Sequence, residues 1–372
     1  QKTAYEIMPS LVGSEMCIRD RPLRRRKMNV WAKFSDGLEF SEEMFKTLVR
    51  YAPDGNLDVF ASDQHSSYLK LTSAYLKHIG ENRPANDEDV REVARRFARA
   101  LSGIPSAALF NHLAYQSPGF RELLGENIML IGRLEDTNTI PIDGGRGQLA
   151  HLAIEPENCV DQVDAFKTLV KLDPDHKESW ERNLEWLQGV FERCQRLGKM
   201  LFNETLMFQR PGESKVEFAK RLPDGLVKIA EAFSPYGHFY KTQVPVLWVE
   251  ENGKITKISS VKSVRDTAEA MFKTSNRPML LLSAAVDFEQ YAAQYAIVAD
   301  LFAGPMCGRA YFKEAFTDSE TKDWDSLEAS FKRIALPRII QIKNLAKVMS
   351  QRWWHRFTWM SEEAKTLIKD KS

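Results

Sequence analysis

The sequence predicts an α/β fold, a (β/α)8 TIM barrel with additional N- and C-terminal helices, and two observations support this prediction. From residue 57 onward, short apolar runs that favour strands alternate with longer amphipathic stretches. The short runs are continuously apolar, as expected for parallel strands that are covered on both faces. Eight such repeats are typical of a barrel. The alternative is a dinucleotide-binding sheet, which requires a GxGxxG motif directly after a strand. No predicted strand is followed by this motif, and the GGRG at 144–147 precedes an apolar run instead.

The expected strands follow one another along the whole barrel. They are LDVFAS at 57–62, AALF at 107–110, IMLIG at 128–132, QLAHLAI at 148–154, MLFNETL at 200–206, HFYKTQVPV at 238–246, MLLLSA at 279–284 and AGPMCG at 303–308.

The segments between these runs predict helices. Asn86 can cap a helix that begins at residue 87. Residues 177–197 place apolar side chains at helical spacing, and Gly198 ends that pattern. Similar periodicity occurs at 214–234, 262–274 and 287–301. The last fifty residues predict extra helices, in which Trp353 and Trp354 are expected to pack against neighbouring elements.

The composition indicates one globular domain over residues 28–372. Apolar residues make up 43% and charged residues 28% of the 372. The four cysteines form no CxxC motif, which favours a reducing, cytoplasmic setting. No apolar stretch is long enough for a membrane span. The slightly acidic body of the chain gives no indication of nucleic-acid binding, and a homo-oligomer is compatible with the sequence.

Residues 1–27 differ from the remainder by their strongly basic composition. They include SLVGSEMCIRDR, which resembles translated sequencing-adaptor sequence. We therefore expect an artefactual or disordered basic tail and a natural start at Met28. The alternative is a basic targeting or nucleic-acid-binding arm.

Lys241 carries the most specific chemical signal. It lies in the apolar run FYKTQVPV, and an outward orientation would bury an unpaired charge against the helices at a cost of several kcal/mol. An inward orientation places it with Phe239 and Gln243 on one face, between an apolar layer and a polar mouth. Desolvation there lowers the pKa of an amine and makes it a nucleophile. The alternative is a lysine that extends from a strand end to water.

Other polar residues follow the strands, and the catalytic mouth of a barrel is formed by the C-terminal ends of its strands. Glu204 is a candidate general acid or base, or else a surface ion-pair partner. Asp63 and Gln64 could bind sugar hydroxyls or cap the following helix. Ser283 and the Gly308–Arg309 pair lie where barrels commonly bind phosphate, because glycine lets backbone amides approach an anion and arginine offers several donors.

Several segments together resemble the class I tagatose-1,6-bisphosphate aldolases and their relatives, including sulfofructose-phosphate aldolase. HFYKTQVPV resembles the strand with the Schiff-base lysine, LKVEVP, and LLLSAAV and GPMCGRAYF resemble LSAGVS and GVLCGRATW. FASDQHSS resembles ALDQRGS, and GRLED resembles SRLPD. The order and approximate spacing agree from about residue 55 to residue 312.

The resemblance implies a class I aldolase that interconverts a ketose phosphate, such as tagatose 1,6-bisphosphate, with dihydroxyacetone phosphate and an aldehyde. Lys241 would form the imine, and Glu204 would transfer protons. Asp63 and Gln64 would hold hydroxyls, while Ser283, Gly308 and Arg309 would hold phosphate. No metal or cofactor is implied, because the imine accepts the electrons.

Three positions differ from the family pattern. A glutamate is replaced by Gln243, and an aspartate is replaced by Asn111. The lysine of a VKFLLYY-like fourth strand aligns best with Gln148, with Leu149 as the alternative. These neutral residues support one alternative, a sugar-phosphate-binding barrel without catalysis. A second alternative is a metal-dependent aldolase or isomerase that uses His65, His112 and His151, although structural histidines are the simpler interpretation.

Overall fold

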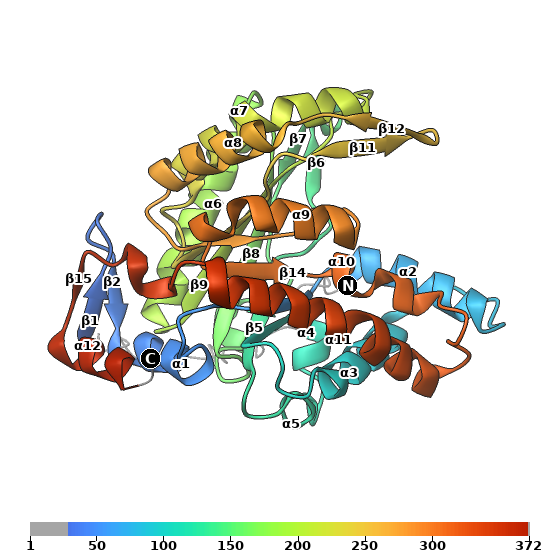
Figure 1. Cartoon of the computed structure of the whole chain (residues 1–372), viewed down its shortest axis with the longest axis horizontal. Helices are drawn as coiled ribbons and strands as arrows, with labels where there is room; N and C mark the ends of the chain where they lie inside the picture. The colour runs from blue at the N-terminus through green and yellow to red at the C-terminus, as the bar shows by residue number, and fades with distance from the viewer. Residues whose placement is uncertain (1–28, 371–372) are drawn as a thin grey trace, which may run out of the picture.

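A computed structural model describes residues 29–370, and the prediction for residues 1–27 lies outside this range. Eight parallel strands close into a barrel in the order β10-β13-β14-β3-β4-β5-β8-β9, which confirms the (β/α)8 fold (Figure 1). The barrel strands are β3 Val59–Ser62, β4 Ala107–Phe110, β5 Met129–Arg133, β8 Ala165–Leu172, β9 Met200–Met207, β10 Phe239–Thr242, β13 Met279–Leu281 and β14 Gly304–Cys307.

Helices surround the barrel and follow the expected periodicity. They are α2 His65–His78, α3 Asp87–Leu101, α4 His112–Tyr115, α5 Phe120–Leu124, α6 Lys177–Arg196, α7 Lys215–Phe233, α8 Val261–Thr274, α9 Phe288–Val298, α10 Arg309–Phe312 and α11 Trp324–Met349. Single-turn 3-10 helices lie at Asp143–Gly145, Pro156–Asn158, Ala299–Leu301, Lys313–Phe316 and Trp353–Arg356. Asn86 caps α3 as predicted, because its Oδ1 accepts hydrogen bonds from the amides of Glu88 and Asp89.

The fourth strand of the barrel is β8, so the prediction of a barrel strand at 148–154 is wrong. β8 pairs with β5 on one side and with β9 on the other. Residues Gly147–Leu149 instead form β7, which pairs with β6 (Ile140–Ile142) in a separate hairpin. β8 reads AFKTLVKL, and its two lysines interrupt the apolar run by which the other strands are recognised.

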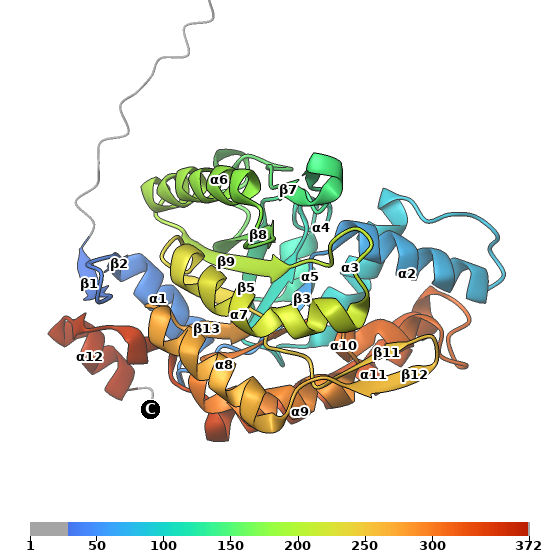
Figure 2. The same ribbon diagram turned by 90° about the horizontal axis from the view of Figure 1, so that it is seen from above.

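Additional elements cover the two ends of the barrel (Figures 1 and 2). β1 (Val30–Lys33), β2 (Glu39–Ser41) and β15 (Trp359–Met360) form a three-stranded sheet beside α1 (Glu42–Tyr51) and α12 (Glu362–Lys369). Both views place this sheet at the opposite end of the molecule from the β11–β12 hairpin, Trp248–Glu251 with Lys254–Lys257. Trp353 is fully buried and donates its indole N–H to the carbonyl of Ala52 at 3.0 Å, so it packs the C-terminal segment onto α1.

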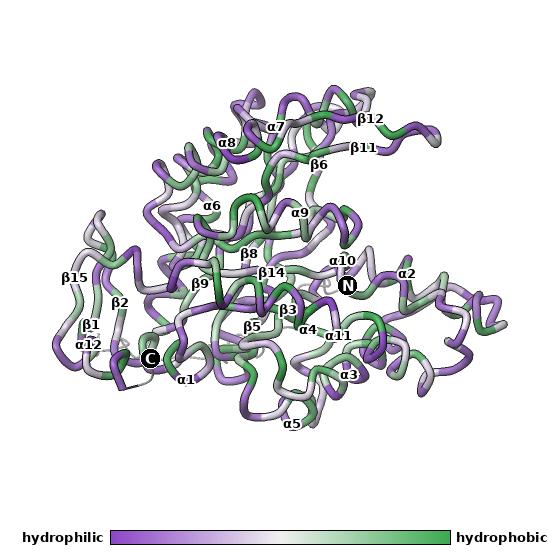
Figure 3. The backbone as a smooth tube through the Cα atoms, in the orientation of Figure 1, coloured by the Kyte–Doolittle hydropathy of each residue, from purple (hydrophilic) through white to green (hydrophobic). Residues whose placement is uncertain are grey.

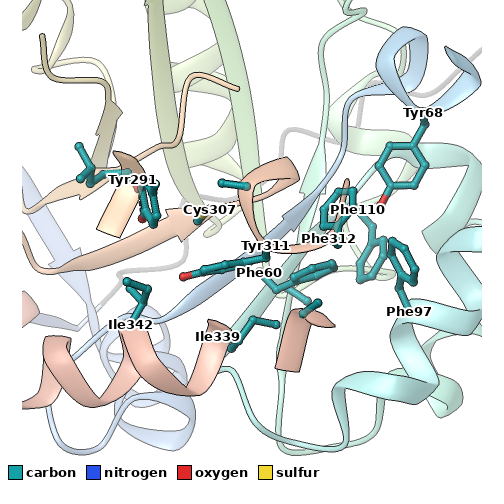
Figure 4. Close-up of a cluster of buried hydrophobic side chains, with 14 of the residues drawn as sticks. Phe60, Tyr68, Phe97, Phe110, Tyr291, Cys307, Tyr311, Phe312, Ile339 and Ile342 are labelled. Carbon is teal, nitrogen blue, oxygen red and sulfur yellow. Dashed lines mark hydrogen bonds between the residues drawn. The ribbon is translucent and has the colours of Figure 1, made fainter. Parts of the chain in front are cut away.

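Two apolar cores follow from the alternation of side chains along each strand. Outward residues such as Phe60 pack against the helices, and Figure 4 shows Phe60, Phe97, Tyr311, Phe312 and Ile339 in this layer. Inward residues such as Phe202 form the floor of the barrel. Figure 3 shows the corresponding contrast, with hydrophobic barrel strands and a hydrophilic tip on the β11–β12 hairpin. No helix within residues 29–370 has the length and apolar character to cross a membrane.

Candidate active site

The inward face of the barrel changes from apolar to ionic toward the C-terminal ends of the strands. Phe202 and Phe239 stack in the floor with their ring centroids 4.6 Å apart. Two residues further along the same strands are Glu204 and Lys241, which are paired across β9 and β10. Lys241 therefore points inward above an apolar layer, as the sequence predicted.

Lys241 contacts one carboxylate within the barrel. Its Nζ donates to Oε2 of Glu204 at 2.8 Å, and the two side chains are 3% and 2% exposed. Gln243 follows on the same face, and its buried Nε2 has no hydrogen-bond partner among residues 29–370. The inward column on β10 thus presents an amine and then an amide that can donate to a bound molecule.

A second lysine lies beside the first and was missed by the sequence analysis. The Nζ of Lys167, on β8, is 2.8 Å from Asp63, 2.7 Å from Glu135 and 2.8 Å from Glu204. Burial alone would lower the pKa of Lys167, but the three carboxylates raise it well above its ordinary value. Lys167 is therefore charged, and its ion pairs connect β8 with β9 and with the segments that follow β3 and β5.

The carboxylates around Lys167 respond differently to burial. Burial would raise the pKa of Asp63, but Lys167 and Lys241 hold it well below its ordinary value. Burial raises the pKa of Glu135, and the attraction of Lys167 does not overcome this effect. Arg133 also supports Asp63, because its Nη1 donates to the carbonyl of Asp63 at 2.7 Å. Asp63 is thus ionised and immobilised above the floor.

A cavity of about 230 Å³ opens at this ionic layer. It brings together all but one of the predicted site residues, which are Asp63, Gln64, Glu204, Lys241, Gln243, Ser283, Gly308 and Arg309. Lys167 and Glu135 do not line it. Lys241 and the Gly308–Arg309 pair therefore face one common space.

The side of the cavity formed by β13, β14 and β3 is closely packed. A side chain at position 308 would place its Cβ 2.5 Å from the carbonyl oxygen of Ala61, so only glycine fits there. Ala284 and Ala285, directly after Ser283, have φ values of 46° and 65°, which an alanine adopts at a cost of order 1–3 kcal/mol. Arg309 is anchored by a 3.1 Å bond from Nη1 to the hydroxyl of Ser67.

Gln148 and Asn111 do not line this cavity. Gln148 lies in the β6–β7 hairpin, where Thr139 donates to its Oε1 at 2.5 Å. Because β8 is the fourth strand and carries Lys167, the inference that a strand-4 lysine is replaced by Gln148 is wrong. Asn111 caps α4 by accepting the amide of Ala114 at 3.1 Å.

The three histidines considered as metal ligands have separate partners or none. His65 bonds to Asp87 at 2.8 Å, and His151 lies 3.7 Å from Asp136. The buried Nδ1 of His112 has no hydrogen-bond partner in the described part of the chain. Across residues 29–370, no three His, Cys, Asp or Glu side chains gather into a group that could hold a metal ion.

The same criterion that selected Lys241 would have selected Lys167. Each is a lysine inside an apolar segment, and in β8 the segment is AFKTLVKL. The segment GRLED carried only a family resemblance in the sequence, but its Arg133 and Glu135 both contact the ionic layer. A charged residue within a barrel strand was therefore the signal for Lys167 and Arg133.

Comparison with solved structures identifies similar proteins. One is a fructose-bisphosphate aldolase from Plasmodium falciparum, in a complex with TRAP and a small-molecule inhibitor, with a TM-score of 0.64 and 13% identity over 87% of this chain and 99% of that chain. Another is Cgl0159 from Corynebacterium glutamicum, with a TM-score of 0.48 and 16% identity over 79% and 92% of the two chains. No protein-family model and no curated protein matches the chain. At this identity, the first similarity establishes the barrel fold that the chain shares with a fructose-bisphosphate aldolase.

Proposed function

We propose that this protein is a class I aldolase in which Lys241 forms a Schiff base with a ketose phosphate. The observation that carries the proposal is the geometry of the cavity. A buried amine, its carboxylate partner 2.8 Å away and the Gly308–Arg309 pair all border one space of about 230 Å³. One small ketose phosphate could contact all of them.

Lys241 is a better nucleophile than Lys167 for electrostatic reasons. An amine must be neutral to attack a carbonyl. Lys167 is bound by three carboxylates, which favour its charged form, and it does not line the cavity. Lys241 touches Glu204 alone among the carboxylates within residues 29–370 and does line the cavity.

The reaction proceeds through an iminium ion. The amine of Lys241 adds to the ketose carbonyl, and water leaves to give the iminium. Glu204 then takes the proton of the C4 hydroxyl while the C3–C4 bond breaks, and the electron pair of that bond passes to the iminium to form an enamine. The aldehyde departs, C3 accepts a proton, and water releases dihydroxyacetone phosphate from Lys241.

The remaining residues bind the substrate in this scheme. Asp63, Gln64 and Gln243 hold hydroxyl groups, and Ser283, Gly308 and Arg309 hold the phosphate of the dihydroxyacetone-phosphate half. Carbon–carbon cleavage needs an electron sink, and the iminium supplies one. The sequence resemblance makes tagatose 1,6-bisphosphate the first ketose to assay.

Borohydride trapping tests the proposal directly. Reduction in the presence of dihydroxyacetone phosphate should add one reduced triose phosphate to Lys241, which peptide mass spectrometry would locate. The Lys241→Met variant should give no adduct, whereas Lys171→Met, which removes a partly buried lysine from the same barrel, should still be labelled. An adduct on another lysine, or none in the folded wild-type protein, would exclude the class I mechanism.

Experiments on the same protein distinguish a sugar-phosphate-binding barrel without catalysis from an aldolase. Such a protein would bind dihydroxyacetone phosphate in calorimetry but would give no borohydride adduct and no cleavage of any ketose phosphate.

A further inference from the structure

The two ends of the cavity differ in chemistry, and this difference concerns the part of the substrate that leaves as the aldehyde. We infer that the aldehyde half is apolar and uncharged, so that the natural substrate carries one phosphate rather than two. The inference rests on the proposed aldolase function and specifies its substrate class.

Opposite the Gly308–Arg309 pair, the cavity has a wall of apolar side chains. Leu206 lies two residues beyond Glu204, on the same inward face of β9. Around it the lining residues are Met207 from β9, Phe218 and Leu222 from α7, and Val246 after β10. A substrate that runs from Arg309 past Lys241 and Glu204 would therefore place its carbons beyond C4 against this wall, which we call the apolar wall.

A second phosphate at the apolar wall would have no cation to pair with. Among the described residues that line the cavity, the cations are Lys241 and Arg309. Lys241 is bonded to C2 of the substrate in the iminium, and Arg309 lies at the other end. A doubly charged group against the apolar wall would lose its hydration without a compensating ion pair, which is unfavourable. An alkyl or aryl group gains free energy from burial at the same place.

Three cations near the apolar wall are held by other groups. Lys171, which is paired with Leu206 in the β8–β9 register, donates from Nζ to the carbonyl of Thr137 at 3.0 Å. The guanidinium of Arg221 lies 5.7 Å from the ring centroid of Phe218, but it bonds to Glu213 at 2.9 Å and to Asp173 at 3.3 Å. Lys215, at the start of α7, donates from Nζ to the carbonyl of Glu250 at 3.0 Å. None of these three cations lines the cavity around Lys241.

The first cavity adjoins a second space, so a short aldehyde is not required. The lining of this second space is mixed, with Lys215, Glu250 and Asp287 beside the apolar residues. A neighbouring cavity of about 520 Å³ shares Val246, Ala284 and Ala285 with the first. Trp248 of the β11–β12 hairpin also lines it. An aldehyde of several carbons, or one with an aromatic ring, can therefore extend from Lys241 along Val246 toward Trp248.

Acceptor selectivity in the synthetic direction tests the inference. With saturating dihydroxyacetone phosphate, kcat/KM for hexanal or phenylacetaldehyde should exceed that for glyceraldehyde 3-phosphate by at least about tenfold, a ratio that corresponds to about 1.4 kcal/mol. The Phe218→Lys variant, which adds a cation to the apolar wall, should shift the ratio toward glyceraldehyde 3-phosphate. Val261→Lys adds the same charge at an exposed position and should leave the ratio unchanged.

A second variant covers the case in which Phe218→Lys does not fold. Leu206→Ala should lower kcat/KM for hexanal more than for glyceraldehyde 3-phosphate, because it removes apolar contact without adding charge. A preference for glyceraldehyde 3-phosphate in wild-type protein that still forms the borohydride adduct would overturn this inference alone. Absence of the adduct, or of turnover with every aldehyde, would remove the aldolase function and the inference with it.

Discussion

Lys241 and Lys167 share one carboxylate oxygen, because Oε2 of Glu204 lies 2.8 Å from the Nζ atoms of both residues. The two lysines come from β10 and β8, on either side of the strand that carries Glu204. While the Lys241 nitrogen is neutral, as the attacking amine and as the enamine, Glu204 keeps an ion-pair partner in Lys167. The carboxylate is therefore held in place for proton transfer throughout the proposed reaction.

Removal of Lys167 should destabilise the protein strongly. Lys167→Met leaves Asp63, Glu135 and Glu204 buried around an uncharged side chain, and loss of one partner from a buried ion-pair cluster costs about 3–5 kcal/mol. The free energy of unfolding, measured by urea titration at pH 7.5, should fall by that amount. Lys171→Met is the matched control, since among residues 29–370 Lys171 donates only to the carbonyl of Thr137, at 3.0 Å. A Lys167→Met variant as stable as this control would contradict the ion-pair cluster.

Substitutions of Glu204 and Glu135 can separate a role in proton transfer from a role in pairing with Lys167. Both bond to Lys167, at 2.8 Å and 2.7 Å, but only Glu204 lines the cavity. Glu204→Gln should lower kcat for ketose-phosphate cleavage by a factor of about 10²–10⁴, the usual contribution of a general acid or base. Borohydride labelling of Lys241 in this variant should still reach completion at long times.

Glu135→Gln should change kcat far less, because Glu135 does not reach the substrate. Single-turnover cleavage kinetics on both variants would make the comparison. Equal losses of kcat in the two variants would mean that Glu204 acts only by holding Lys167.

The fold was largely predictable because barrel strands are recognised by continuous apolar runs. Residues 107–110 were assigned to a strand with the bounds that β4 has in the structure. The fourth strand was misplaced because Lys167 and Lys171 interrupt the apolar run of β8, and the carboxylates that pair with Lys167 come from other segments of the barrel. The run at 148–154 is apolar for a different reason, since β7 packs beside α6 and β8 outside the barrel.

The site was predictable where a residue directly follows a strand. Asp63 and Gly308 directly follow β3 and β14, Ser283 lies two residues beyond β13, and all three line the cavity. Glu135 is buried by its contact with Lys167, 32 positions away in the sequence, so its role depends on the closure of the barrel. The β11–β12 hairpin, which borders the second cavity, carries partly exposed and charged side chains and lacks the apolar signal of a barrel strand.

Arg309 should contribute to phosphate binding rather than to bond cleavage. A charge-assisted hydrogen bond contributes about 1.5–3 kcal/mol, so Arg309→Met should raise KM for dihydroxyacetone phosphate by roughly tenfold to a hundredfold. The yield of borohydride adduct at saturating substrate should remain close to that of the wild type. Arg91→Met, which removes a surface arginine paired with Glu88 at 2.7 Å, is the control and should leave KM unchanged. A loss of kcat without a change in KM would place Arg309 in the chemical step instead.

Asp58 should make the stability of the protein depend on pH. It is 2% exposed, and neither of its carboxylate oxygens has a hydrogen-bond partner among residues 29–370. Burial raises the pKa of Asp58 from 3.8 to about 7, although Lys343 lies 3.7 Å away and opposes this effect. Between these two pKa values the folded state binds more protons than the unfolded state. The free energy of unfolding should therefore fall as pH rises from about 4 to about 7.

Asp58→Asn removes this proton-binding difference and keeps the size of the side chain. Above pH 7 the variant should be more stable than the wild type by on the order of 4 kcal/mol, and at pH 4 the two should be equal. Urea unfolding of both proteins at pH 4, 6 and 8 would measure the difference. Asp54→Asn, at a position whose side chain is 45% exposed, should show no comparable trend. If Asp58→Asn is less stable than the wild type at pH 8, the ion pair with Lys343 outweighs the burial of the carboxylate.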